Sequence, residues 1–151
     1  MNLIFETALF NRRALKEFLE ELTYEQLTKI PANFNNSIFW NIAHVLVTQQ
    51  LLVYEFSGLP KGIDDDIIAK YRKGSKPTSR VSKEDINYVK NNLISTIEQI
   101  QKDYKNGIFK EYEAYHTSVD ITLKNIDDAL KFNTFHDGIH LGVILSLKKI
   151  V

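Results

Sequence analysis

Apolar residues recur at every third or fourth position in four long segments of the chain, which is the period of an amphipathic α-helix. These segments are 3–22, 37–56, 82–107 and 125–149. Between them, no run alternates apolar and polar residues with the period of two that a half-buried strand requires. The pattern therefore predicts an all-α protein without a β-sheet.

Polar residues at the starts of the segments are typical of helix caps. Ser82 and Asp85 have the spacing of a capping box, in which the first side chain accepts from a backbone N–H one turn later. Thr23 and Gln26 have the same spacing and predict a short additional helix after the first long one. Ser37 is placed to cap the second long helix.

Long connections join the second, third and fourth helices across residues 57–81 and 108–124. Connections of this length allow crossovers, so the sequence predicts a four-helix bundle that need not alternate up and down. The acidic triplet 64–66 lacks the spaced ligands of a calcium loop, and we interpret it as an exposed turn. Residues 1–151 have the length of a single domain.

Two of the four histidines, His136 and His140, are four residues apart in the last helix. This spacing places them one turn apart on the same face, where two imidazoles can bind one ion. Most other residues on that stripe are apolar, so we expect both side chains to point inward.

His44 lies on an apolar stripe of the second helix that includes Trp40 and Val47. Three inward histidines from two helices are the ligand set of a zinc-type site with an open fourth position. The alternative is that each is a core histidine, hydrogen-bonded to a neighbour such as Asn41 or Asn133. The residues alone leave both interpretations open.

Other polar residues near the histidines are weaker candidates. Asp137 follows His136, but a step of about 100° turns it away from a bound ion, so we expect it at the surface or behind the ligands. Thr48 and Tyr54 lie near the stripe of His44 and are candidates to line a pocket. Asn41 and Asn133 are each one turn from a histidine and are candidates to orient an imidazole. We expect His116, in the last long connection, at the surface.

Composition narrows the functional classes. The 151 residues carry 19 basic and 19 acidic side chains, which leaves no surplus of positive charge for a nucleic acid or an anionic membrane. The absence of cysteine excludes disulfides and thiolate metal ligands. No basic leader and no apolar run of about 20 residues is present, so we expect a soluble cytoplasmic protein.

Four motifs together resemble the DinB-like (DinB/YfiT) superfamily of metal-dependent proteins. They are residues 36–45 (NSIFWNIAHV), 57–60 (SGLP), 71–77 (YRKGSKP) and 135–142 (FHDGIHLG). Their order and spacing match the superfamily over essentially the whole chain.

The resemblance implies a four-helix bundle with crossover topology, often a homodimer, with a divalent metal, usually zinc or nickel, on three histidines. Carried onto this chain, it assigns the metal ligands to His44, His136 and His140. Many relatives follow the last histidine with Arg-Gly-Gln, whereas this chain has Leu141-Gly142-Val143, which removes a polar group near the site.

A divalent ion on three neutral imidazoles acidifies a bound water or a bound thiol. The resemblance therefore implies a hydrolase or a transferase that uses a low-molecular-weight thiol, with an unknown small-molecule substrate. The non-enzyme alternatives are a bundle that uses the metal only for stability and a dimerising interaction module. Haem does not suit two histidines on one helix turn.

Overall fold

The computed structural model describes residues 2–76 and 80–151, and 65% of the chain is helical, as the hydrophobic pattern predicts. The elements in the described residues are α1 (Asn2–Glu21), α2 (Tyr24–Thr28), α3 (Ile38–Gln50), the π-helical turn η1 (Leu51–Glu55), α4 (Asp65–Tyr71), α5 (Lys83–Lys105), β1 (Tyr115–His116), β2 (Thr122–Leu123) and α6 (Ile126–Leu147). None of the described helices is long and apolar enough to cross a membrane.

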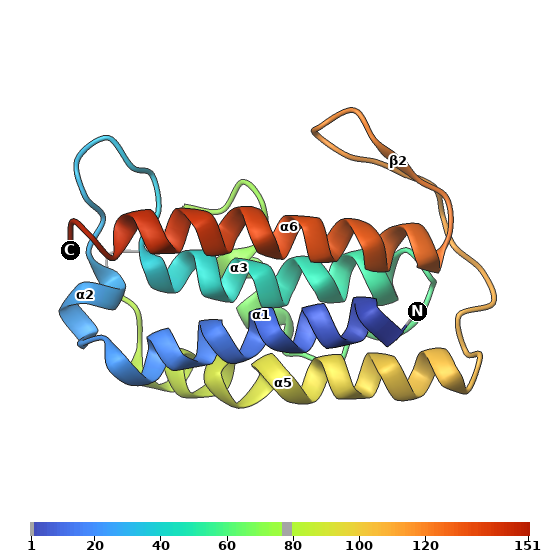
Figure 1. Cartoon of the computed structure of the whole chain (residues 1–151). Helices are drawn as coiled ribbons and strands as arrows, with labels where there is room; N and C mark the ends of the chain where they lie inside the picture. The colour runs from blue at the N-terminus through green and yellow to red at the C-terminus, as the bar shows by residue number, and fades with distance from the viewer. Residues whose placement is uncertain (1, 77–79) are drawn as a thin grey trace.

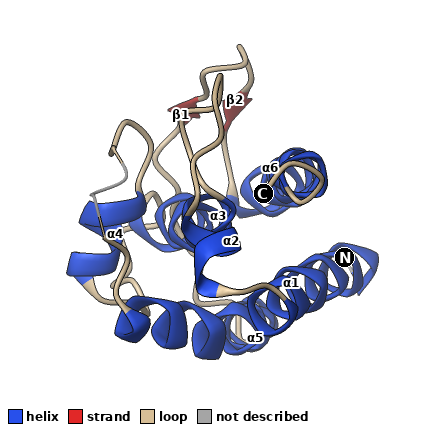
Figure 2. Ribbon diagram, turned by 90° about the vertical axis from the view of Figure 1, so that its left-hand side faces the viewer, coloured by secondary structure: helices blue, strands red, loops and turns tan. Residues whose placement is uncertain are grey.

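The four long helices α1, α3, α5 and α6 lie alongside one another (Figure 1). α1 packs against α5 and α6, and α3 packs against the same two helices, so the four contacts close a ring. α3 and α5 run in the same direction, and the connection through α4 returns the chain along their length. Figure 2 shows α4 on the outside of α3, and the β1–β2 hairpin above α3 beside α6.

The predicted caps are present. The Thr23 hydroxyl accepts from the Gln26 N–H at 3.2 Å, and the Gln26 side chain accepts in return from the Thr23 N–H at 3.1 Å. Ser37 accepts from the N–H of Trp40, and Ser82 accepts from that of Asp85. These bonds satisfy backbone donors that have no partner within a helix, and they fix where α2, α3 and α5 begin.

The core is centred on α3, which is buried on nearly all of its faces. A main cluster surrounds it with apolar side chains of α1, α4, α5 and α6, among them Leu15, Ile68, Leu93 and Ile144. This packing fixes the position of α3 relative to α6, the two helices that carry the three candidate ligands.

Two elements depart from the sequence prediction. Residues 57–81 contain α4, and the acidic triplet expected as an exposed turn lies at the start of this helix, where negative charge is favourable. The helix buries Ile67, Ile68 and Tyr71 against the core, but seven residues are too few for a clear periodic signal. The last connection contains the β1–β2 pair, whose strands of two residues each give no readable alternation.

The last turn of the second predicted helix is not α-helical. The α-helix stops at Gln50 and continues as the π-helical turn η1. π-helical turns within helices are rare and are found frequently at functional sites. Pro77, the last residue of the third motif, lies outside the described residues.

Candidate metal centre

The structure brings together the three histidines selected from the sequence. His44 comes from the middle of α3, and His136 and His140 come from adjacent turns of α6. The ring centroids are separated by 5.3 Å (His44 to His136), 4.9 Å (His44 to His140) and 4.5 Å (His136 to His140). One nitrogen from each ring lies within 4.8 Å of the other two, which positions the three side chains to hold a metal ion.

Hydrogen bonds to the outer nitrogens set the tautomers of two rings. His44 donates from Nδ1 to the carbonyl oxygen of Tyr71 at 2.8 Å. His140 donates from Nδ1 to Oδ1 of Asn41 at 2.8 Å, and the Asn41 amide donates to the Ser37 carbonyl. Because Tyr71 and Asn41 offer acceptors, each neutral ring keeps an unprotonated Nε2, the nitrogen that can bind a metal.

The surroundings of His136 indicate whether the three histidines suit a metal ion. Its Nδ1 is buried and has no hydrogen-bond partner among the described residues. A buried polar atom without a partner costs stability, and such atoms are rare in folded proteins. An orphaned imidazole nitrogen beside two rings with unprotonated Nε2 atoms fits a site made for a cation.

Burial lowers the pKa of all three histidines. For His136 the pKa falls to about 2, first through burial and then through the charges of His140 and His44. For His140 it falls to about 4, again first through burial. In His44 burial outweighs the hydrogen bond to Tyr71, and the nearby charge of Lys73 lowers the pKa further. At neutral pH all three rings are therefore uncharged, the form that binds metal.

Trp40 supports His44 from one turn earlier in α3. Its ring stacks on the imidazole at a centroid distance of 4.6 Å and an interplanar angle of 12°. The indole N–H donates to Ser75 Oγ at 3.3 Å, in the loop after α4. The stack and the hydrogen bond connect two of the motifs noted in the sequence and restrict the tilt of the His44 ring.

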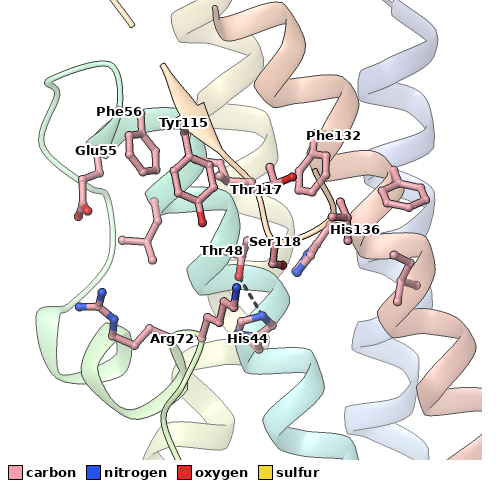
Figure 3. A pocket seen from close by; sticks show the side chains of 16 residues that line it. His44, Thr48, Glu55, Phe56, Arg72, Tyr115, Thr117, Ser118, Phe132 and His136 are labelled. Carbon is pink, nitrogen blue, oxygen red and sulfur yellow. Dashed lines mark hydrogen bonds between the residues drawn. The ribbon is translucent and has the colours of Figure 1, made fainter. Parts of the chain in front are cut away.

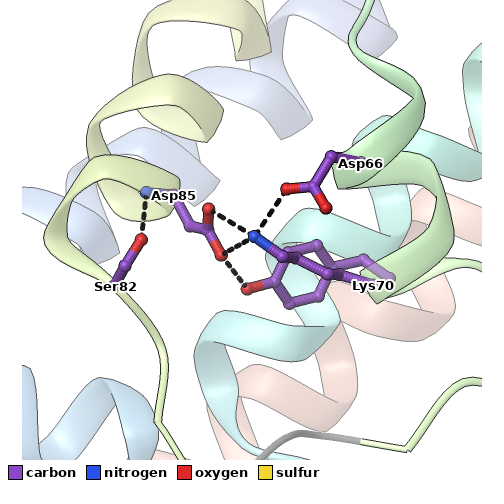
Figure 4. Close-up of polar contacts among 5 residues, drawn as sticks. Asp66, Lys70, Ser82 and Asp85 are labelled. Carbon is purple, nitrogen blue, oxygen red and sulfur yellow. Dashed lines mark hydrogen bonds and ion pairs between the residues drawn. The ribbon is translucent and has the colours of Figure 1, made fainter.

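α4 is held in place by a polar network that ends at the histidine site (Figure 4). Lys70 lies between Asp66 and Asp85, at 2.6 Å and 3.1 Å. The Tyr71 hydroxyl donates to the same Asp85 carboxylate at 3.0 Å, and Ser82 caps the backbone there. Because the Tyr71 carbonyl accepts from His44, the network that fixes α4 also fixes a contact of the site.

A cavity of about 290 Å³ opens onto His44 and His136 (Figure 3). Its lining comes from α3, η1, the segment after α4, the β1–β2 hairpin and α6, and comprises His44, Thr48, Leu51, Leu52, Glu55, Phe56, Arg72, Lys73, Tyr115, Thr117, Ser118, Val119, Phe132, Phe135, His136 and Ile139. Figure 3 shows Thr48 and Ser118 beside the two histidines. The site is therefore accessible to a small molecule, as a catalytic centre requires.

Not all the weaker candidates are at this site. Thr48 lines the cavity, and its hydroxyl is 3.2 Å from Nε2 of His44. Tyr54 is absent from the cavity lining and instead donates to Asp103. Asn41 contacts an imidazole, as predicted, whereas Asn133 is buried with Oδ1 unpartnered among the described residues. His116 is at the surface, as predicted.

Asp137 was expected at the surface or behind the ligands, and the surface location is wrong. Its side chain is fully buried and accepts from Nε of Arg12, in α1, at 3.2 Å. The buried stripe of α6 runs through Asn133, Asp137 and Ile144, so the two metal-site histidines lie at its edge and not at its centre. Burial raises the pKa of Asp137, although the neighbouring Arg12 opposes the shift.

Several site residues were missed by the sequence analysis. Tyr71 contributes only its backbone carbonyl, for which no side-chain pattern exists. Arg72 and Lys73 lie in the third motif, which was the available signal, but their place beside the histidines depends on the unpredicted α4. Tyr115 reaches the cavity through the unpredicted hairpin.

Most of the chain matches the model of a known protein family. The model of a family described as the DinB superfamily matches residues 9–144, which include all three histidines. No curated protein matches the chain.

Proposed function

The chain belongs to the DinB superfamily, and we propose that it is a metal-dependent enzyme that holds one divalent ion, zinc or nickel, on His44, His136 and His140. The observation that carries the proposal is the meeting of three neutral imidazoles, two of which, those of His44 and His136, line a cavity. The four-helix bundle with crossover connections and the homodimer rest on the family, and the cytoplasmic location rests on the sequence composition; all three belong to the same proposal.

A cavity beside the ligands favours a catalytic over a structural ion. Structural zinc sites are closed by four protein ligands, whereas catalytic sites keep a position for water or substrate. Among the described residues, the grouping that can hold an ion contains three side chains, all histidines. The ion would supply Lewis acidity, lowering the pKa of a water or thiol that it binds.

Of the two reaction types, transfer of a thiol fits the site better than hydrolysis. A hydrolase needs a base beside the attacking water. Glu55 is the one carboxylate that lines the cavity among the described residues, and it is paired with Lys61 at 3.1 Å. A thiol loses its proton on binding the ion and does not depend on such a base. We therefore propose a low-molecular-weight thiol as one substrate.

Metal analysis of the purified protein tests the ligand set. We expect about one divalent ion per chain in the wild type and less than about a tenth of that in His44→Ala and His136→Ala, because each removes one of three ligands. His116→Ala is the matched control, since it removes an exposed histidine outside the site and should retain the ion. Equal metal content in all four proteins would refute the proposal.

The cobalt-substituted protein tests the thiol. Addition of 2-mercaptoethanol should produce a sulfur-to-cobalt charge-transfer band, and ethylene glycol, which differs in carrying oxygen for sulfur, should not. If the cobalt spectrum is the same with both compounds, the ion does not bind a thiol. A large loss of thermal stability on chelation without any spectral response would instead support the metal-stabilised bundle.

A further inference from the structure

The cavity that opens onto His44 and His136 has two cationic residues in its lining. Arg72 and Lys73 directly follow α4 and line the cavity beside His44. Among the described residues neither forms an ion pair with a carboxylate. The cavity lining therefore includes two exposed cationic residues, with Arg72 at its outer edge, that form no ion pair in the described part of the chain.

Charged residues near Arg72 and Lys73, in contrast, do form ion pairs. Lys70, in the last turn of the same helix, is neutralised by both Asp66 and Asp85. Glu55 lies at the same edge of the cavity as Arg72 in Figure 3, but its ion-pair partner is Lys61. The one carboxylate of the cavity lining among the described residues is thus paired with Lys61, and the cavity wall keeps a net positive charge.

Aromatic side chains form another part of the cavity lining. Phe56 and Tyr115 lie with ring centroids 4.5 Å apart, and Phe132 lies across the cavity from them (Figure 3). Aromatic walls bind the apolar body of a ligand, while a few polar groups fix its orientation. A ligand that satisfies this cavity has an apolar body and one anionic end.

The backbone just before the two cations is tied to the histidine site. Tyr71, the residue before Arg72, is anchored to Asp85 through its hydroxyl and to His44 through its carbonyl. The backbone at Arg72 therefore lies at a defined distance from His44. Because Tyr71 is anchored before the two cations and Ser75 contacts Trp40 after them, an anion that binds there need not order this segment of backbone.

We propose that the cavity binds a small amphipathic anion, with its carboxylate or equivalent acidic group on Lys73 and Arg72 and its apolar body against Phe56, Tyr115 and Phe132. This inference rests on the proposed function only in placing the reacting end of the ligand at the three histidines. The contact with the cations belongs to the protein alone and is testable by binding.

Phenylacetate and its neutral amide, phenylacetamide, are matched probes for an NMR titration of the isotopically labelled protein as purified. Phenylacetate should bind about tenfold more tightly, as expected for one charge-assisted hydrogen bond. Lys73→Ala should remove most of that preference and Arg72→Ala/Lys73→Ala all of it. Lys76→Ala, a lysine of the same loop outside the cavity lining, should retain it.

The metal content of each sample is measured alongside, so the two proposals fail separately. A wild type without metal that still prefers phenylacetate, and loses the preference in Lys73→Ala, refutes the metal site and supports the anion site. Equal affinity for both probes, or equal behaviour of Lys73→Ala and Lys76→Ala, overturns the anion site. It is also overturned if chelation, and not Lys73→Ala, abolishes the preference, because the carboxylate is then a metal ligand.

Discussion

Two consecutive residues of α6, His136 and Asp137, face different surroundings. Asp137 is sealed against α1, where Arg12 donates to its carboxylate and to the Val45 carbonyl at 3.3 Å. His136 faces the cavity and leaves Nδ1 without a partner among the described residues. Each leaves one buried atom without a partner among the described residues, Oδ1 of Asp137 and Nδ1 of His136, but Asp137 is paired with the charge of Arg12 whereas His136 borders a cavity.

The difference separates a stabilising contact from a binding site. A buried ion pair stabilises the fold only while both partners are present, because either charge alone has lost its water. Burial shifts the pKa of Asp137 upward and that of Arg12 downward, so desolvation outweighs attraction on both sides. The unpartnered Nδ1 of His136 has no such counterpart among the described residues, and its cost is offset only when something binds.

Breaking the ion pair should give the largest effect. Arg12→Leu or Asp137→Leu alone should lower the free energy of unfolding by about 3–5 kcal/mol, because each leaves a buried charge unpaired. The double variant Arg12→Leu/Asp137→Leu should recover most of this loss, since no charge remains buried. Urea denaturation measures all three, and a double variant no more stable than the singles would contradict this account.

On the open side, Asn41→Leu should weaken metal binding by about 10- to 100-fold, because His140 loses the acceptor that fixes its tautomer. Asn41→Asp keeps an acceptor oxygen and should restore most of the affinity. Competition with a chromophoric chelator measures both variants. Affinities for Asn41→Leu and the wild type within a factor of two would show that the contact does not orient His140.

The smallest expected effect comes from Tyr71→Phe, which keeps the carbonyl bond to His44 and removes the hydroxyl that donates to Asp85. The free energy of unfolding should fall by about 1 kcal/mol, as for one hydrogen bond. Metal affinity should be unchanged, because the Lys70–Asp85 ion pair still anchors α4. Thermal denaturation and the chelator competition test the two parts, and a parallel loss of metal affinity would show that α4 must be anchored by its side chains.

The long helices were predictable because each repeats its apolar residues over many turns and begins at a recognisable cap, such as Ser82. The pair His136 and His140 was predictable because its spacing is local, and the convergence of His44 followed from its inward stripe. In these cases the signal lies within a single helix, which a linear sequence displays directly.

The rest depends on contacts between distant parts of the chain. The burial of Asp137 is decided by Arg12, which is far away in sequence. α4 depends on packing against the core and on Asp85, because seven residues are too few for a helix to be stable by itself. The hairpin that contributes Tyr115 to the cavity is equally short. Each of these features was invisible to periodicity because tertiary packing, and not local preference, determines it.

The hydrogen bond from His44 to the Tyr71 carbonyl has a consequence for mutational tolerance. A backbone carbonyl is supplied by every amino acid, so no single substitution at position 71 removes the acceptor itself. The acceptor for His140 is a side chain, and one codon change at Asn41 abolishes it. The two histidines therefore differ in their sensitivity to mutation. A single substitution at Asn41 removes the acceptor that orients His140, whereas the acceptor of His44 is lost only if the backbone of α4 is displaced.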